Sequence, residues 1–333
     1  MSPILRISLI IPAVFSFGPL DAASLNFVTF DYPGSTGTEL AGINDGGQII
    51  GSFSTASTYG QGFIRNADGS LIPIVLPYQS IDSPPGGINA SGQVVGAFFN
   101  PGTFFSPGYL RSTAGTYSII TDPINPNNSG AGAINDAGQM VGTYVDPVNS
   151  LVHGFLDNGG TFTTIDDPNM AANSFGEEYT ELSGINNAGQ IVGIYSDAVG
   201  SHGFLRSPAG GFTTIDAPGA NPGTTSVTGL NNLGMIVGSF TDNSGIHSFI
   251  RSADGSTYLT IDDPSGFQTT IEGINDSGDI VGWYFTSLTA GQMSGFIATP
   301  TIAGTVPEPM SFALSLAGLA AMVCAKRLFR NQP

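Results

Sequence analysis

GINNAGQIVG, at residues 184–193, is rich in glycine and carries no charged side chain. Its first six residues have the G-x-x-x-x-G outline of a phosphate-binding loop, but that motif continues with Lys and then Ser or Thr. Here Gly189 is followed by Gln190 and Ile191. The lysine that would bind a phosphate is therefore missing. The stretch is also repeated elsewhere in the chain.

The same pattern occurs six times in the sequence. The other copies are GINDGGQIIG at 42–51, GINASGQVVG at 87–96, AINDAGQMVG at 133–142, GLNNLGMIVG at 229–238 and GINDSGDIVG at 273–282. Their asparagines, spaced 45, 46, 51, 45 and 44 residues apart, are Asn44, Asn89, Asn135, Asn186, Asn231 and Asn275. A fixed period of about 40–50 residues is typical of the blades of a β-propeller.

Each unit reads as four short strands. The first ends in G-I-N, and an N-x-x-G turn follows, in which a glycine such as Gly189 suits a left-handed backbone conformation. The second strand carries another glycine, Gly193 in this copy, which indicates close approach of a neighbouring backbone or a bulge. The third and fourth strands are represented by GFLR at 203–206 and GFTTIDAP at 211–218.

The two ends of the repeat region predict how the ring closes. The last unit stops at GFIA, residues 295–298, without a fourth strand, whereas NFVTFDYP at 26–33 resembles the fourth strand TFTTIDDP at 161–168. An N-terminal strand that completes the last blade removes the open edges of a ring of repeats. We therefore predict an all-β fold, a six-bladed β-propeller over residues 25–300. An open β-solenoid is the alternative, and it would not need this circular offset.

Composition agrees with a folded, turn-rich β protein. The chain is 41% hydrophobic and 10% charged, with 47 glycines and 22 prolines, whereas disordered chains have fewer apolar and more charged residues. Residues 25–300 contain 23 acidic residues against four arginines, a formal charge of about −19. Such a surface repels nucleic acids and anionic lipids, so neither is expected as a partner.

The N-terminal segment has the pattern of a signal peptide. Arg6 precedes an apolar run at residues 7–17, and the small residues Ala22 and Ala23 follow. The run is too short to span about 30 Å of hydrocarbon. We predict that residues 1–23 are a signal peptide and that the chain is exported.

The C-terminal segment has the pattern of a membrane helix. Residues 310–325 are mostly apolar and precede Lys326, Arg327 and Arg330. By the positive-inside rule this basic cluster stays on the cytoplasmic side and the preceding chain lies on the other side. We predict a hydrophobic helix and basic tail at 310–333, preceded by a linker at 301–309.

Residues 306–330 closely resemble the PEP-CTERM sorting signal, which combines a Pro-Glu-Pro motif, a hydrophobic helix and a basic terminus. The motif consists here of Pro307, Glu308 and Pro309. The resemblance implies processing by an exosortase, transient anchoring in the inner membrane, and delivery to the cell surface or an exopolysaccharide-rich biofilm matrix. A plain C-terminal membrane anchor has the same topology but gives Glu308 no special role.

The units also resemble the HAF extracellular repeat, named for a His-Ala-Phe motif. The corresponding residues are HGF at 153–155, HGF at 202–204 and HSF at 247–249. Alanine is replaced by glycine or serine, and three of the six units lack the histidine. This resemblance implies an exported repeat protein.

Four arginines end the third strands of their units: Arg65, Arg111, Arg206 and Arg251. Equivalent positions on different blades lie far apart unless they face the axis. We therefore interpret the arginines as partners of nearby aspartates, such as Asp68, Asp167 or Asp263, rather than as a shared anion site.

Three histidines, His153, His202 and His247, also share one repeat position. Zinc needs ligands within about 2.0–2.1 Å, which side chains on separate blades do not reach off the axis, so we interpret these residues as packing. The aspartates in INDSGD at 274–279 and TDNSG at 241–245 do not match a calcium-binding loop, which favours turn formation over calcium. We predict no cofactor.

The glutamates of the domain form the candidate binding face. We expect all five in loops that lead into the innermost strands: Glu39, Glu177, Glu178, Glu181 and Glu272. The loop between the second and third strands of unit two, on the same face, carries Phe98, Phe99, Phe104 and Phe105. Acidic groups beside aromatics suit carbohydrate or cation binding. Solvated acids that keep an exported protein soluble are the other interpretation.

These observations predict a monomeric, exported and non-enzymatic surface or matrix protein, a scaffold or a glycan-binding module. The alternative is a secreted glycan-active hydrolase or lyase, because glycoside hydrolysis needs two carboxylates about 5–9.5 Å apart.

Overall fold

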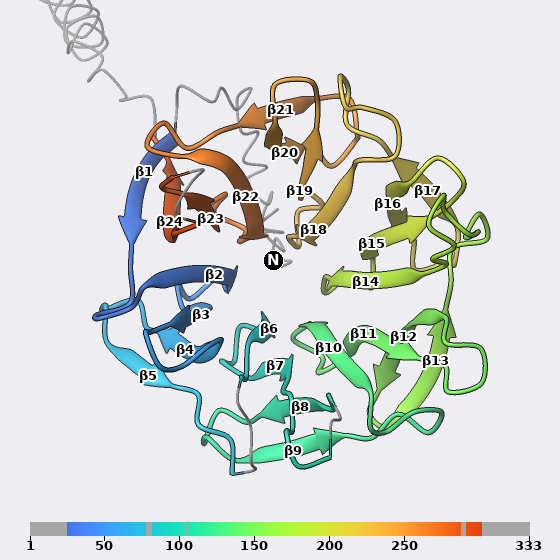
Figure 1. Cartoon of the computed structure of the whole chain (residues 1–333), viewed down its shortest axis with the longest axis horizontal. Helices are drawn as coiled ribbons and strands as arrows, with labels where there is room; N and C mark the ends of the chain where they lie inside the picture. The colour runs from blue at the N-terminus through green and yellow to red at the C-terminus, as the bar shows by residue number, and fades with distance from the viewer. Residues whose placement is uncertain (1–24, 78–81, 104–105, 288–290, 302–333) are drawn as a thin grey trace, which may run out of the picture. The chain divides into compact units, whose positions relative to one another are not determined.

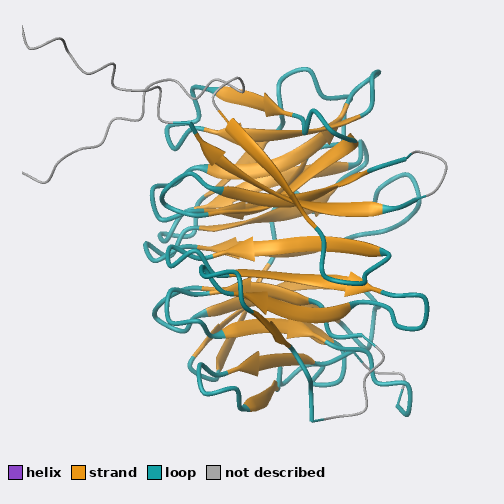
Figure 2. Cartoon of the chain, turned by 90° about the vertical axis from the view of Figure 1, so that its left-hand side faces the viewer, coloured by secondary structure: helices purple, strands orange, loops and turns teal. Residues whose placement is uncertain are grey.

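The computed structural model describes residues 25–77, 82–103, 106–287 and 291–301. These residues form 24 strands and no helix, arranged as six four-stranded antiparallel sheets around a central axis (Figure 1). Figure 2 shows the same strands from the side of the ring. The predicted six-bladed β-propeller is confirmed.

In blades one to five the strands follow the chain from the axis outward, and blade six takes its outermost strand from the N-terminal segment. Blades one to three consist of β2 (Gly37–Ile43), β3 (Ile49–Ser54), β4 (Gln61–Arg65) and β5 (Leu71–Pro73); β6 (Pro85–Ile88), β7 (Val94–Ala97), β8 (Gly108–Arg111) and β9 (Tyr117–Ile120); and β10 (Ser129–Ile134), β11 (Met140–Val145), β12 (Val152–Asn158) and β13 (Thr161–Ile165). Blades four to six consist of β14 (Thr180–Ile185), β15 (Ile191–Ser196), β16 (Ser201–Arg206) and β17 (Phe212–Ile215); β18 (Ser226–Leu230), β19 (Ile236–Thr241), β20 (Ile246–Arg251) and β21 (Tyr258–Ile261); and β22 (Phe267–Ile274), β23 (Ile280–Phe285), β24 (Met293–Pro300) and β1 (Leu25–Phe30).

Blade six is completed by the N-terminal strand. The sheet order is β1-β24-β23-β22, so β1 occupies the outer position that β5 or β17 fills in other blades. The rings of Phe27 and Phe296 pack 5.6 Å apart between β1 and β24. The ring therefore closes through the circular offset that the sequence predicted, and the open solenoid is excluded.

The predicted terminal segments lie outside the described residues. This holds for the signal peptide at 1–23, the motif Pro307–Pro309, and the helix and basic tail at 310–333. Within the described ranges, no helix is long and apolar enough to cross a membrane.

The hydrophobic core lies between neighbouring blades. Val141 of blade three packs with Ile191 and Phe204 of blade four, and all three side chains are almost completely buried. The other blade interfaces repeat this arrangement with their own second and third strands. Burial of one such side chain contributes about 1.5–3 kcal/mol, so each blade depends on its neighbours for stability.

The two glycines of each repeat shape the inner hairpin. Gly189 has a φ of 74° in the turn between β14 and β15, the left-handed conformation that the sequence predicted. In β14 the register shifts between Leu182 and Gly184, and a methyl group at Gly193 would overlap the Glu181 carbonyl oxygen of this bulged strand. Both expected causes of the second glycine, a bulge and close backbone approach, are therefore present.

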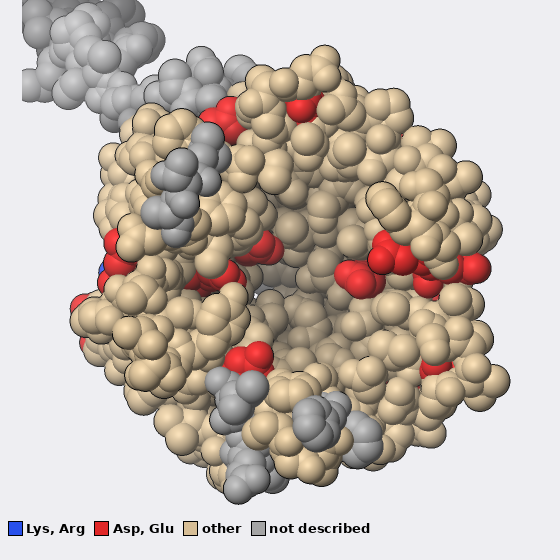
Figure 3. Space-filling model, viewed as in Figure 1, with Lys and Arg blue, Asp and Glu red and all other residues tan. Residues whose placement is uncertain are grey.

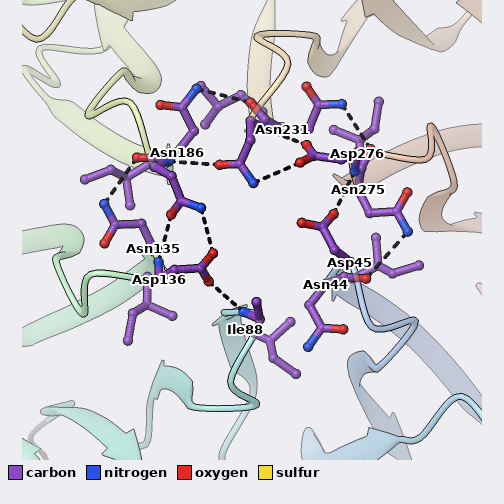
Figure 4. Close-up of a pocket in the computed structure, with 17 residues that line it drawn as sticks. Asn44, Asp45, Ile88, Asn135, Asp136, Asn186, Asn231, Asn275 and Asp276 are labelled. Atoms are coloured by element: carbon purple, nitrogen blue, oxygen red, sulfur yellow. Dashed lines mark hydrogen bonds between the residues drawn. The ribbon is translucent and has the colours of Figure 1, made fainter. Parts of the chain in front are cut away.

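Six asparagines join the blades at the axis, and Figure 4 shows five of them: Asn44, Asn135, Asn186, Asn231 and Asn275. Asn186 Oδ1 accepts a hydrogen bond from Gln190 N (3.0 Å), which closes the turn, while Asn186 Nδ2 donates to the backbone carbonyl of Asn231 in the next blade (3.1 Å). The same contact links every neighbouring pair of blades: Asn44 to Asn89, Asn89 to Asn135, Asn135 to Asn186, Asn231 to Asn275, and Asn275 to Asn44. We call this closed circle the asparagine ring.

Replacement of Asn186 by aspartate tests the ring. The variant keeps the oxygen that closes the turn but loses the amide donor and places a carboxylate against the Asn231 carbonyl. We expect N186D to lower the free energy of unfolding by roughly 2–3 kcal/mol at pH 7, measured by chemical denaturation.

The matched control is Asn149→Asp. Asn149 lies in an exposed turn, where its Oδ1 accepts from Leu151 N, so the same chemical change leaves that bond intact. Equal losses of stability in the two variants would contradict the role of the ring.

Candidate functional site

The innermost strands enclose a channel, and the residues that line it differ between its two ends. Next to the asparagine ring, the residue before each asparagine is aliphatic and borders a small cavity of about 80 Å³: Ile43, Ile88, Ile134, Ile185, Leu230 and Ile274. Because side chains two residues apart share a face of a strand, residues earlier in the strands line the rest of the channel. The aliphatic collar and the asparagine ring narrow this end.

The other end of the channel opens into a larger cavity of about 360 Å³. Its wall includes Glu181 and Ser183 of β14, Ser226 and Thr228 of β18, and Glu272 of β22, with glycines of blade three opposite. Acidic side chains surround the central hollow of the face drawn in Figure 3. We call this cavity and Glu39 of the neighbouring strand β2 the acidic chamber.

The expected positions of the glutamates were wrong for three of the five. Glu39, Glu181 and Glu272 lie within innermost strands, because these strands begin earlier than the repeat pattern suggests. Glu177 and Glu178 do lie in the loop before β14, where Glu177 accepts a hydrogen bond from Asn173 Nδ2. The structure thus divides the predicted face into a channel group and a loop group.

Fewer of the predicted aromatic residues can be assigned to the candidate binding face. Phe98 is 3% exposed and packs in the core between blades one and two, so it is not part of an open face. Phe104 and Phe105 lie outside the described residues.

Glu272 has the most perturbed carboxyl group of the chamber. Burial raises its pKa, the indole N–H of Trp283 lowers it through a 3.1 Å bond to Oε1, and the nearby carboxylate of Glu39 raises it further, to about 7. Burial also raises the pKa of Glu39 and of Glu181. Glu272 therefore exchanges its proton near neutral pH.

Glu272 and Trp283 both depart from the repeat. Residues at the position of Glu272 in the other units are small or hydroxylic: Ala41, Gly86, Gly132, Ser183 and Thr228. Those at the position of Trp283 are Ser52, Ala97, Thr143, Ile194 and Ser239. The sequence analysis missed Trp283, although it is the single tryptophan of the chain and a column-by-column comparison of the units would have revealed it.

The opposite end of the channel carries carboxylates with structural partners. Next to the asparagine ring, Asp276 N donates to Asp45 Oδ1 and Ala90 N donates to Asp136 Oδ1, both at 2.8 Å across blade boundaries. Asn187 and Asn232 continue this pattern. These side chains link blades, and the described residues hold no group of three or more His, Cys, Asp or Glu side chains placed to bind a metal ion.

Within the described residues, no arginine forms an ion pair with the aspartates named from the sequence; hydrogen bonds from Ser70 and, less strongly, the charge of Arg65 lower the pKa of Asp68. The guanidinium groups of Arg65, Arg206 and Arg251 lie over the rings of Phe30, Phe212 and Tyr258, at 5.5, 5.8 and 5.9 Å from the ring centres. Asp167 and Asp263 are buried and accept hydrogen bonds from the backbone within their own turns. Cation–π contacts replace the expected ion pairs of these three arginines, because β17 and β21 place Phe212 and Tyr258 beside Arg206 and Arg251, and β1 of blade six places Phe30 beside Arg65.

The histidines join strands within a blade. Each Nδ1 contacts an aspartate that directly follows the fourth strand: His153 to Asp166, His202 to Asp216 and His247 to Asp262. The rings pack against Tyr144, Tyr195 and Phe240. The three imidazoles remain on separate blades.

In blade five Ser244, His247 and Asp262 form a hydrogen-bonded series like that of nucleophilic hydrolases. However, Ser244 Oγ is only 2.6 Å from Asp242 Oδ1, which also lies 3.2 Å from His247 Nε2. Burial lowers the pKa of His247, and the carboxylates of Asp262 and Asp242 raise it, with a net increase. An imidazole that favours its protonated form is a poor general base, so this series does not define an active site.

No protein-family model and no curated protein matches the sequence. Among solved structures, the chain is similar to AofleA from Arthrobotrys oligospora, with 13% identity and a TM-score of 0.53 over 83% of this chain and 89% of that one. It is also similar to a protein of unknown function from Dyadobacter fermentans, with 12% identity and a TM-score of 0.52 over 83% of this chain and 99% of that one. A third similar structure is XC5397, a gluconolactonase from Xanthomonas campestris, with 11% identity and a TM-score of 0.50 over 83% of this chain and 89% of that one. At these identities the similarity shows the fold alone, since propellers support many functions.

Glu272→Gln tests the buried carboxyl group through the pH dependence of stability. Because folding raises this pKa from 4.5 to about 7, the stabilisation from its protonated form is complete below pH 4.5 and is lost as the pH rises through 7. Glutamine still accepts from Trp283 but does not titrate. We expect E272Q to be more stable than the wild type at pH 8, by up to about 3 kcal/mol, and nearly equal to it at pH 4.

The measurement is denaturant unfolding followed by circular dichroism at both pH values. Glu177→Gln, in the exposed loop before β14, serves as the control and should show no such change between the two pH values. A stability difference for E272Q that is the same at pH 4 and pH 8 would contradict the assignment.

Proposed function

We propose that this chain is an exported, non-enzymatic repeat protein of the cell surface or extracellular matrix whose propeller binds a glycan in the acidic chamber. The main support for binding is that Glu272, which lines the cavity, and its partner Trp283 both differ from the residues at the same positions of the other five units. The asparagine ring and the core account for the repeated residues, whereas neither needs a carboxyl group at 272.

The chamber has the dimensions and chemistry of a small-ligand site. Its volume of about 360 Å³ falls at the lower end of the range of roughly 300–1,000 Å³ typical of such sites. Carboxylates from three blades and the hydroxyl groups of Ser183 and Thr228 offer hydrogen-bond acceptors to sugar hydroxyl groups. A rigid ring of blades holds these groups without the need for a loop to close.

Export is supported by the sequence at both ends of the chain. The pattern of residues 1–23 suits secretion, and Pro307–Pro309 with the apolar segment and basic cluster suits sorting by an exosortase-type enzyme at the inner membrane. The propeller has many more acidic than basic residues, which suits a protein that remains soluble in a polysaccharide matrix.

A glycan-active hydrolase or lyase is the second candidate, favoured by one observation. Glu272, with a pKa of about 7, would act as a general acid while the nearby Glu39 carboxylate acts as base or nucleophile. Both functions place the ligand in the same chamber, so the release of cleaved product distinguishes an enzyme from a binding protein.

The binding proposal is tested with the purified full-length chain and a panel of polysaccharides, scored for retention and for released products. We expect binding without product release, weakened about tenfold by E272Q and unchanged by the loop control E177Q. Product release abolished by E272Q or by Glu181→Gln would identify the enzyme instead. Equal binding by E272Q and the wild type would place the glycan elsewhere.

The sorting proposal has a separate test in cells. Replacement of Pro307, Glu308 and Pro309 by alanines should stop processing and retain the protein in the inner membrane fraction. Alanines at Ile302, Gly304 and Thr305 provide a control of equal size beside the motif. Unchanged processing and location of the motif variant would reject the exosortase partner.

A further inference from the structure

Two hydroxyl groups of the acidic chamber, those of Ser183 and Thr228, offer acceptors to a ligand, because their protons are used elsewhere. Ser183 Oγ donates to the Val227 carbonyl oxygen at 2.7 Å, and Thr228 Oγ1 donates to the Ile271 carbonyl oxygen at 2.6 Å. Both hydroxyl oxygens therefore keep only lone pairs for the channel. Glu181 and Glu272, in their ionised forms, likewise only accept, so this part of the wall favours a ligand rich in donors.

Among the described residues that line the chamber, none is a lysine or an arginine. The arginines of the described residues end third strands, away from the axis, and three of them lie over aromatic rings. Within the described part of the chain, the one side-chain donor bound to Glu272 is the neutral indole of Trp283. The negative charge of the chamber is therefore left for a ligand to balance.

The position of the charge is defined by the fold. Trp283 Nε1 orients Glu272 from β23, and Glu39 approaches from β2 of the next blade closely enough to influence its ionisation. Glu181 faces the same cavity from β14. The aliphatic collar and asparagine ring narrow the far end, so a ligand enters from the open end.

We propose that the acidic chamber selects a sugar with a free amino group, whose ammonium is held by Glu272 and the nearby Glu39, with Glu181 lining the same cavity. An ammonium supplies three donors and one positive charge, which match an anionic wall rich in acceptors. A neutral sugar satisfies the donors but leaves the charge unbalanced, and a uronate is repelled. This inference rests on the proposed glycan binding and specifies its ligand class.

The experiment compares three β-1,4-linked tetramers that differ at carbon 2 of each ring: glucosamine, N-acetylglucosamine and glucose. Calorimetry on the full-length chain at pH 7 measures affinity. Emission from Trp283, the single tryptophan of the chain, reports contact at the chamber. We expect the glucosamine tetramer to bind at least about tenfold more tightly than either neutral tetramer, and added salt to weaken its binding.

Variants then locate the ammonium. E272Q should reduce affinity for the glucosamine tetramer about tenfold, whereas E177Q should not, although both replace one carboxyl group by an amide. Glu181→Gln, which changes the same cavity without disturbing Trp283, provides a second variant if E272Q folds poorly. An equal effect of E177Q and the chamber variants would indicate general attraction to an acidic surface and overturn the proposal.

The outcomes separate this inference from the proposed function. Equal affinity for all three tetramers, or preference for a neutral one, overturns amino-sugar selection and leaves glycan binding intact. Failure of every tetramer to bind, while a polysaccharide of the panel does bind, likewise overturns the selection alone. Failure of all tetramers and all polysaccharides overturns both.

Discussion

One amide group per blade holds the axis of this propeller together. Each asparagine of the ring closes its own hairpin turn with Oδ1 and binds the next blade with Nδ2, so a single side chain serves local and tertiary structure. Asn275 completes the circle by donating to Asn44, which is 231 residues away. The contacts are buried, and loss of any donor removes the hydrogen bond to the next blade, so that the carbonyl group keeps only its bond from the glycine of its own turn.

This ring determines which side chains enter the channel. With the asparagine fixed, strand alternation directs the preceding aliphatic residue inward to form the collar, and residues further upstream line the acidic chamber. The bulge in each inner strand and the glycine opposite it allow the strands to pack closely enough for this arrangement. The chamber is thus a consequence of repeated packing, while its chemistry comes from Glu39, Glu181, Glu272 and Trp283.

Much of the fold could be read from the repeat. The left-handed turn glycine, the strand glycine and the circular closure through β1 were all predicted, because each depends on residues that recur at a fixed spacing. The site was predicted less well. Glu272 was expected in a loop because the start of β22 depends on pairing with β23, and the loop phenylalanine Phe98 proved to be buried. Trp283 was missed because its importance arises from its contact with Glu272 across two strands.

The number of blades, the turns between their strands and the order in which the ring closes can be derived from the sequence. These features follow from local backbone preferences and from a pattern that repeats along the chain. Tertiary packing, in contrast, sets which acidic residues share a cavity, which aromatic rings contact the arginines, and which carboxylates have no positive partner among the described residues. Those relationships join residues on different strands and blades, and their distances depend on how the strands pack rather than on their spacing in the sequence.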